Sequence, residues 1–98
     1  SEYDGNSNFV LRLDLTKVKL PLIIRTRKTG DKMQVKNLGT KKVKDILINE
    51  KIDIDKRKNI PIVIDSKNNI LWLPGIKKSK FDVGKNEKCD IILLCERK

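Results

Sequence analysis

The chain has 98 residues and no histidine, and its 23 Lys and Arg against 13 Asp and Glu give a net charge of +10 at neutral pH. This length supports one domain with a small core, so we expect a single domain over residues 1–98 with a polar lead-in at 1–8. The longest apolar runs are only a few residues, far short of the ~20 that cross a bilayer. We therefore expect no membrane partner. Residues 1–8 are polar and acidic and do not resemble a signal peptide, so we expect a cytoplasmic location, the alternative being a leader that lies outside this sequence.

Apolar patterning predicts a fold made mostly of strands. Residues 9–15 alternate apolar and polar positions, which indicates a strand with one face on a core. Residues 20–25 are apolar on both faces, so we expect a strand that is covered on both sides. Two further strands, joined as a hairpin by a polar loop, are expected at 60–64 and 70–73. A short strand at 81–83 and a last strand at 89–95 complete the set, whereas the Gly-containing breaks within 29–40 predict a loop.

One helix is expected at residues 41–49. Val43, Ile46 and Leu47 recur at helical spacing, and Thr40 stands in the N-cap place. The charged segment 53–59 leads into a proline and predicts a polar turn. The fold class is therefore α+β, a small mixed or antiparallel sheet domain with one short helix.

The sequence contains no recognisable catalytic motif. Without histidine, Ser66 and Ser79 lack the usual positioned base, and neither phosphate-binding glycine motif occurs. Cys89 and Cys95 would lie ~20 Å apart on an extended strand, too far for a disulfide. With no histidine and no paired cysteines, a zinc site is not expected. We expect no catalytic residue, metal or cofactor in this chain, and the sequence gives no support for an autonomous enzyme.

Positive charge is concentrated in one third of the chain. Residues 25–58 hold 12 basic and 5 acidic residues, an excess of seven. Lys41 and Lys42 fall in the first turn of the expected helix, where the macrodipole disfavours cations by a few tenths to ~1 kcal/mol. Free N–H groups and two lysines at a helix start would instead suit a phosphate. We therefore expect a polyanion, and nucleic acid above all, as the partner.

Two arginines on an extended stretch add to this pattern. Arg25 and Arg27 flank one residue, so both should point to one face, where guanidinium forks can hold phosphate or guanine. The alternatives are ordinary surface arginines or a structural pair between an arginine and Asp31. The four aromatic residues, Tyr3, Phe9, Trp72 and Phe81, are too few for a stacking surface, and Trp72 is expected in the core. This favours reading of structured nucleic acid through its backbone and shape.

Three ordered motifs resemble one known family. They are Ile-Arg-Thr-Arg-Lys-Thr-Gly-Asp at 24–31, Gly-Thr-Lys-Lys-Val-Lys-Asp at 39–45 and Trp-Leu-Pro-Gly-Ile at 72–76. From about residue 20 to its end, the chain resembles the C-terminal domain of bacterial tRNA(Ile)-lysidine synthetases. The resemblance implies a parent in which an N-terminal domain uses ATP and Mg to join lysine to the wobble cytidine of an isoleucine tRNA. That domain's Ser-Gly-Gly-x-Asp-Ser loop is absent here.

The resemblance also implies the partners of this chain. The family's last domain grips the tRNA near its acceptor stem, so tRNA(Ile) and the N-terminal catalytic domain are expected partners. The candidate tRNA-binding residues are Arg25, Arg27, Lys28, Lys41, Lys42, Lys44, Arg57, Lys77 and Lys78. Arg25, Arg27, Lys41, Lys42 and Arg57 stand at positions that the family pattern shares. The alternative is a docking or dimerisation module without RNA contact, which predicts an exposed apolar patch built from the first strand or Trp72.

Overall fold

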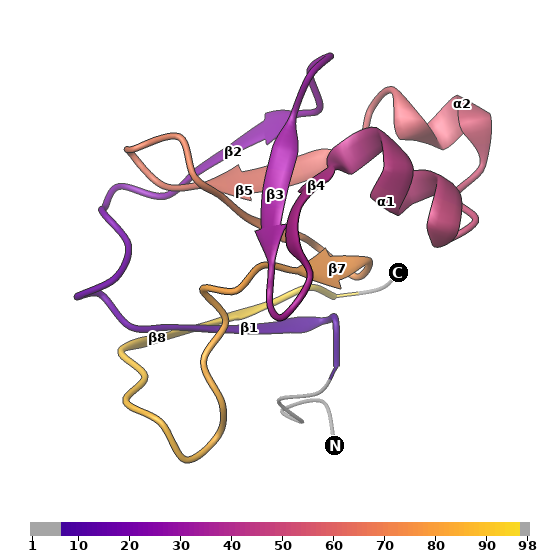
Figure 1. Ribbon diagram of the computed structural model, residues 1–98. Helices are drawn as coiled ribbons and strands as arrows, with labels where there is room; N and C mark the ends of the chain where they lie inside the picture. Colours follow the sequence, from indigo (N-terminus) through magenta and orange to yellow (C-terminus); the bar gives the residue numbers. More distant parts are fainter. Residues whose placement is uncertain (1–6, 97–98) are drawn as a thin grey trace.

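The computed structural model describes residues 7–96, so most of the expected lead-in, and Tyr3, lie outside the described residues. The described residues form eight short strands and two short helices, and Figure 1 shows how they are arranged. In chain order they are β1 (Val10–Leu13), β2 (Ile23–Thr26), β3 (Lys32–Val35), β4 (Gly39–Lys42), α1 (Val43–Asn49), α2 (Ile54–Arg57), β5 (Pro61–Ile64), β6 (Ile70–Leu73), β7 (Lys77–Lys78) and β8 (Ile91–Leu94).

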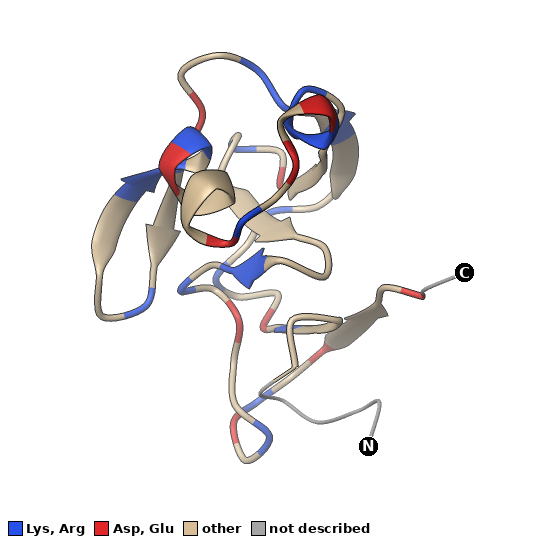
Figure 2. Ribbon diagram, turned by 90° about the vertical axis from the view of Figure 1, so that its right-hand side faces the viewer, with Lys and Arg blue, Asp and Glu red and all other residues tan. Residues whose placement is uncertain are grey.

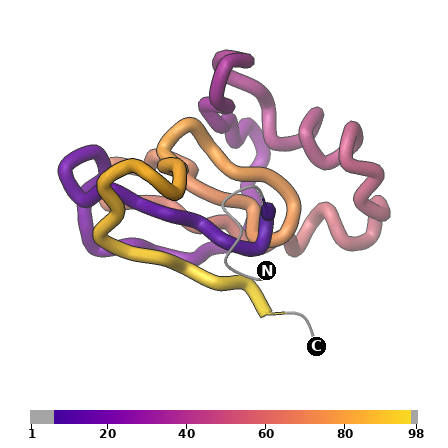
Figure 3. The backbone as a smooth tube through the Cα atoms, turned by 90° about the horizontal axis from the view of Figure 1, so that it is seen from below, coloured from indigo at the N-terminus to yellow at the C-terminus, as the bar shows by residue number. Residues whose placement is uncertain are grey.

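The strands form three antiparallel sheets. The largest has the order β2-β5-β6-β7, and the other two are the β1–β8 ribbon and the β3–β4 hairpin. The expected hairpin of strands at 60–64 and 70–73 is confirmed as β5 and β6. Seen from below, the helices project to one side of the β1–β8 ribbon (Figure 3). The fold class is α+β, as predicted.

The β5–β6 hairpin is the centre of the fold because it is buried on both faces. On one face, Ile62 and Leu73 pack with Met33 of the β3–β4 hairpin and Leu47 of α1. The other face packs against β1. There Val63, Leu71 and Trp72 of the hairpin form a buried cluster with Leu11 and Leu13 of β1. The expectation that Trp72 lies in the core is confirmed, and its indole Nε1 donates to the carbonyl of Asn8 at 3.0 Å.

The prediction that the strand at residues 20–25, now β2, is covered on both faces is wrong. Ile23 is 45% exposed and Ile24 is 72% exposed. The sheet order explains this, because among residues 7–96 β2 pairs with β5 alone and is an edge strand. The prediction of one buried face for the first strand is also incomplete. Val10 and Leu11 are adjacent and so lie on opposite faces of β1, yet they are 1% and 0% exposed.

Residues 29–40 form a hairpin and not the predicted loop. Met33 and Val35 are buried, and the turn between β3 and β4 uses left-handed backbone at Asn37 (φ 65°) and Gly39 (φ 73°). The alternation of only two apolar side chains, Met33 and Val35, is too short a pattern to predict a strand. The turn expected at 53–59 contains the single helical turn α2, and residues 81–83 form no strand, because Val83 is buried singly in an irregular segment.

Helix α1 begins two residues later than predicted. Lys41 and Lys42 end strand β4, and Lys42 occupies the N-cap position with extended dihedrals (φ −68°, ψ 133°). Thr40 lies inside the strand and gives no side-chain cap. The hypothesis of two lysines in the first helical turn is therefore wrong, and any role for them must come from the hairpin.

The cysteines and the helices can be compared with the predictions made from the sequence. Cys89 and Cys95 are free and half-buried. Within residues 7–96, neither helix has the length or apolar character needed to cross a bilayer.

A buried carboxylate holds the loop between β5 and β6. The side chain of Asp65 is fully buried and accepts hydrogen bonds from the amides of Lys67 (3.0 Å) and Asn69 (2.8 Å) and from Asn69 Nδ2 (3.1 Å). Because Asp65→Ala leaves these donors without an acceptor, we expect it to lower the free energy of unfolding by roughly 2–4 kcal/mol. Urea unfolding measures this, with Ser66→Ala as the exposed neighbour control. A loss no larger than the control's contradicts this role for Asp65.

Candidate nucleic-acid interface

Basic side chains are unevenly distributed over the molecule. Figure 2 shows them on the β3–β4 hairpin, the two helices and β7, whereas the β1–β8 ribbon carries few. Most candidate residues therefore fall on one part of the fold. The contacts of each side chain distinguish cations that form an ion pair within the fold from cations that do not.

Arg25 is held by a structural ion pair. Its Nη1 and Nη2 each donate to a carboxylate oxygen of Asp31 at 3.0 Å, as the alternative for this arginine predicted. Asp31 also accepts from the amide of Lys28 (2.8 Å), and its carbonyl accepts from the amide of Val43 (2.9 Å). Partial burial acts to raise the pKa of Asp31, but the hydrogen bonds from Arg25 and Lys28 and the arginine charge hold that pKa below its ordinary value. The Arg25 guanidinium is thus already engaged by the Asp31 carboxylate.

Four other cations surround a concave surface that we call the cationic hollow. It has a volume of about 220 Å³ and is lined by Arg27, Thr29, Gly30, Asp31, Lys32, Lys42 and Lys44. Within residues 7–96, no ion pair involves Lys32, Lys42 or Lys44. The only acid in the lining is Asp31, which already pairs with Arg25. The hollow therefore carries uncompensated positive charge.

The strand register places two of these lysines opposite each other. Lys32 and Lys42 are partners in the antiparallel β3–β4 pair. Cross-strand partners share one face, and like charges directly opposite destabilise the pair. Lys44 lies two residues further on, in α1. The hairpin thus accepts a repulsive arrangement that an external anion would relieve.

Arg27 lies at the edge of the cationic hollow and is only partly free. Its Nη1 donates to the carbonyl of Arg57 at 3.4 Å, and its Nε is buried without a hydrogen-bond partner among residues 7–96. Arg57 in turn donates from Nε to the carbonyl of Ile52 at 2.8 Å. The two arginines therefore brace the segment around α2 more than they extend into solvent.

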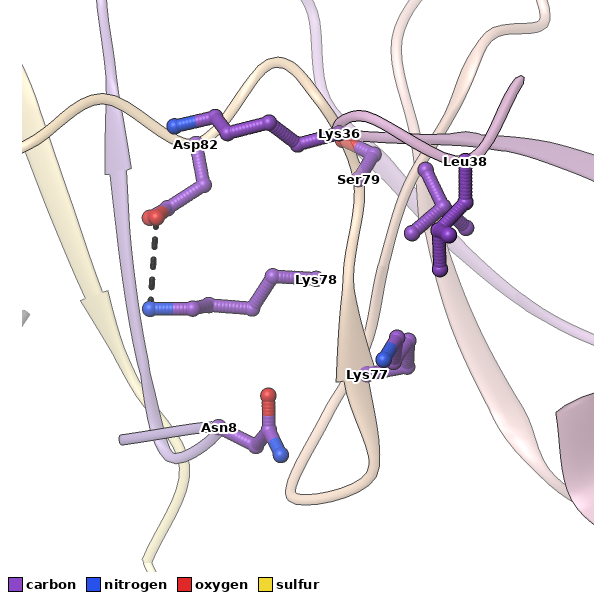
Figure 4. Close-up of a pocket in the computed structure, with 8 residues that line it drawn as sticks. Asn8, Lys36, Leu38, Lys77, Lys78, Ser79 and Asp82 are labelled. Carbon is purple, nitrogen blue, oxygen red and sulfur yellow. Dashed lines mark ion pairs between the residues drawn. The ribbon is translucent and has the colours of Figure 1, made fainter. Parts of the chain in front are cut away.

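A second depression lies beside β7, with a volume of about 260 Å³ (Figure 4). Its lining comprises Asn8, Val35, Lys36, Leu38, Lys77, Lys78, Ser79 and Asp82. Lys78 is shielded and forms an ion pair with Asp82 at 3.2 Å, with side-chain exposures of 11% and 12%. Lys77 also lines the neighbouring depression that contains Lys41. Lys36, Lys41 and Lys77 are therefore the cations on this side of the hairpin that have no ion pair among the described residues.

The structure brings some of the candidate residues together and separates others. Arg27, Lys42 and Lys44 share the cationic hollow, and Lys77 and Lys78 share the depression beside β7. Lys32 and Lys36, which line the cationic hollow and the depression beside β7, are not among the residues predicted from the sequence, because residues 29–40 are expected to be a loop. The alternation of Met33 and Val35 before the Asn-Leu-Gly turn is the signal that could place Lys32 on a strand and Lys36 directly after it.

Comparison with known proteins gives consistent matches. A family model described as the TilS substrate C-terminal domain matches residues 22–93. A tRNA(Ile)-lysidine synthase of Bacillus subtilis (strain 168) is 48% identical over 82 residues, which cover 83% of this chain and 17% of that protein. One from Geobacillus kaustophilus (strain HTA426) is 46% identical over 91 residues, covering 92% of this chain and 19% of that protein. The chain thus spans less than a fifth of the length of these relatives.

A solved structure agrees with the sequence matches. The crystal structure of a TILS C-terminal domain superposes with a TM-score of 0.80 and 44% sequence identity, covering 90% of this chain and 68% of that chain. The resemblance found in the sequence motifs is therefore confirmed, and it extends to the arrangement of the strands.

Stability measurements can separate the structural cations from the free ones. Arg25→Ala removes two charge-assisted hydrogen bonds from a partly buried pair, so we expect it to lower the free energy of unfolding by roughly 1–3 kcal/mol. Lys32→Ala relieves the cross-strand repulsion, so we expect a change within about 0.5 kcal/mol or a gain. Urea unfolding of both variants checks this. Equal losses for the two would contradict the distinction.

The Arg25 effect should also depend on pH. Because the pKa of Asp31 is lowered in the folded chain, the pair stabilises the fold above the ordinary carboxylate value of 3.8, and this contribution is lost as pH falls through the lowered value. The penalty of Arg25→Ala should therefore shrink in unfolding experiments below pH 3.8. A penalty that is independent of pH contradicts the pairing.

Proposed function

The chain belongs to the family of TilS substrate C-terminal domains, and on this basis we propose that it is the tRNA-binding C-terminal module of a tRNA(Ile)-lysidine synthetase. In this proposal a cytoplasmic parent enzyme carries an N-terminal domain that binds ATP and Mg and attaches lysine to the wobble cytidine. The module described here contacts tRNA(Ile) near its acceptor stem. Its contribution is to hold the correct tRNA while the chemistry occurs elsewhere in the parent.

The observation that carries the proposal is the uncompensated charge of the cationic hollow. Three lysines without an ion pair among the described residues line one concave surface, and two of them face each other across the hairpin. Phosphates are the anions that such a surface suits, because nucleic-acid backbones present closely spaced charges with a condensed counterion layer. Binding would release those counterions and relieve the repulsion between Lys32 and Lys42.

The hairpin also gives the proposed interface its length. Lys32 begins β3 and Lys36 follows its end, so the two lie ~13 Å apart along extended chain. Along one strand of a duplex, phosphates follow each other at roughly 3.4 Å of axial rise. The hairpin can therefore contact several phosphates, with Lys32 and Lys42 at one end and Lys36 at the other.

A salt series with tRNA(Ile) tests the proposal. The logarithm of the binding constant should fall linearly with the logarithm of salt concentration, with a slope of about −0.7 to −0.9 for each phosphate neutralised. The variant Lys32→Ala/Lys42→Ala/Lys44→Ala should bind more weakly, with a slope shallower by roughly two to three phosphate contacts. Its stability should be unchanged or higher.

The matched control removes the same charge elsewhere. Lys17, Lys19 and Lys85 are exposed residues of the β1–β2 connection and the turn before β8. Changing all three to Ala should leave the salt slope closer to that of the unmodified chain. Equal effects of the two triple variants, or binding that is insensitive to salt, would contradict a site at the hairpin.

A second candidate function is docking onto another part of the parent synthase or onto a second copy of the chain. The patch expected at the first strand or Trp72 is wrong, because Leu11 and Trp72 are buried. The observation that favours docking is instead the exposed edge strand β2, where Ile24 is 72% exposed beside Ile23. An unpaired apolar edge of this kind is a common contact for another chain.

Sedimentation velocity over a wide concentration range tests the self-association arm. If β2 forms a dimer contact, the sedimentation coefficient should rise with concentration, and Ile24→Lys should abolish the rise because a buried unpaired charge is costly. Lys17→Ala is a surface control that should leave the rise intact. Concentration-independent sedimentation of the unmodified chain would remove the dimer from consideration.

A further inference from the structure

Another concave surface lies between the β3–β4 hairpin and the loop that joins β5 and β6, next to the cationic hollow. We call it the amide hollow because carboxamide side chains dominate its lining. It has a volume of about 230 Å³ and is lined by Lys32, Gln34, Thr40, Asn68, Asn69, Ile70 and Phe81. Lys32 lines both hollows, so a ligand whose phosphate sits in the cationic hollow would place its neighbouring groups here.

The polar side chains of the amide hollow are available for a ligand. Gln34 and Thr40 are cross-strand partners, so their side chains stand side by side on the exposed face of the hairpin. Within residues 7–96, the side chains of Gln34, Thr40 and Asn68 have no hydrogen-bond partner. The hollow therefore offers two carboxamides and a hydroxyl whose donors and acceptors are unused.

The walls of the amide hollow are held in place by other contacts. Asn69 donates from Nδ2 to buried Asp65 at 3.1 Å, and its Oδ1 has no hydrogen-bond partner in the part of the chain that the structure describes. Asn68 is fixed in the left-handed backbone region at φ 66°, and its amide donates to the carbonyl of Asp65 at 3.1 Å. On the opposite wall, the carbonyl of Gln34 accepts from the amide of Lys80 at 2.8 Å. The backbone of these walls would therefore need little ordering for binding.

The chemistry of the lining selects among nucleic-acid groups. A phosphate would find only one cation, Lys32, in the amide hollow. A stacked base would need an open aromatic face, but Phe81 is half-buried and packs against the core on the β1 side. Amide and hydroxyl groups instead match base edges and ribose hydroxyls, which are exposed together in the wide minor groove of an RNA helix.

We propose that the amide hollow receives the 2′-hydroxyls and base edges of an RNA minor groove, and that it makes the domain prefer RNA to DNA. Gln34, Thr40 and Asn68 are the residues that make these contacts, while the lysines of the cationic hollow hold the flanking phosphates. The inference rests on the proposed function, because it assumes that the domain binds a nucleic-acid helix at the hairpin.

The test compares one RNA duplex with the DNA duplex of the same sequence, by fluorescence anisotropy at fixed salt. The unmodified 98-residue chain should bind the RNA duplex more tightly. Gln34→Ala, Thr40→Val and Asn68→Gly each remove a polar group from an exposed position, and glycine tolerates the left-handed backbone at 68. Each should weaken RNA binding about two- to tenfold and leave DNA binding nearly unchanged. Asn86→Ala, an exposed carboxamide in the turn before β8, is the control and should change neither.

The outcomes separate this inference from the proposed function. If the chain binds RNA and DNA equally, or if the variants weaken both to the same extent, the role of the amide hollow is overturned while a phosphate-binding hairpin stands. If the chain binds neither duplex nor tRNA in a salt-dependent manner, both proposals fail. Circular dichroism confirms that each variant is folded before its affinity is compared.

Discussion

The bidentate ion pair between Arg25 and Asp31 holds the junction beside which Lys32, Lys42 and Lys44 lie. Arg25 belongs to edge strand β2, and Asp31 directly precedes β3. The carbonyl of Asp31 also accepts the amide hydrogen of Val43, the first residue of α1. One carboxylate residue thus joins the large sheet, the β3–β4 hairpin and the helix. The positions of Lys32, Lys42 and Lys44 follow from that junction.

The ion pair also divides the positive charge into two kinds. Arg25, Lys78 and Lys88 each have an acidic partner and stabilise contacts within the fold. Lys32 and Lys42 have none among the described residues, and the hairpin register forces them together. Net charge alone indicates a polyanionic partner, but only this division indicates which face would meet it. The proposed phosphate contacts therefore lie on a hairpin whose own lysines are unpaired within residues 7–96, whereas Arg25 beside it is paired with Asp31.

Parts of the fold could be predicted because their signals are local. Residues 60–73 contain two apolar runs around a polar loop, and this is enough to specify a buried hairpin. The exposure of Ile24 could not be predicted, because it depends on the order of strands in the sheet. The β3–β4 hairpin could not be predicted because Met33 and Val35 are buried by contacts with α1 and the β5–β6 hairpin, which are distant in the sequence. For the same reason the sequence places Lys41 and Lys42 at a helix start, whereas both residues end strand β4 and the helix begins at Val43.

The central claim is that the β3–β4 hairpin is the RNA-binding face of the domain. Nuclear magnetic resonance titration of the ¹⁵N-labelled chain with a short RNA helix tests it most directly, because each backbone amide reports its own contact. The account predicts perturbed amide signals in residues 32–44 and 68–69, with residues 84–94 of the turn and strand β8 unaffected. Perturbations confined to β2 and β8, or none at RNA concentrations where anisotropy shows binding, would contradict it.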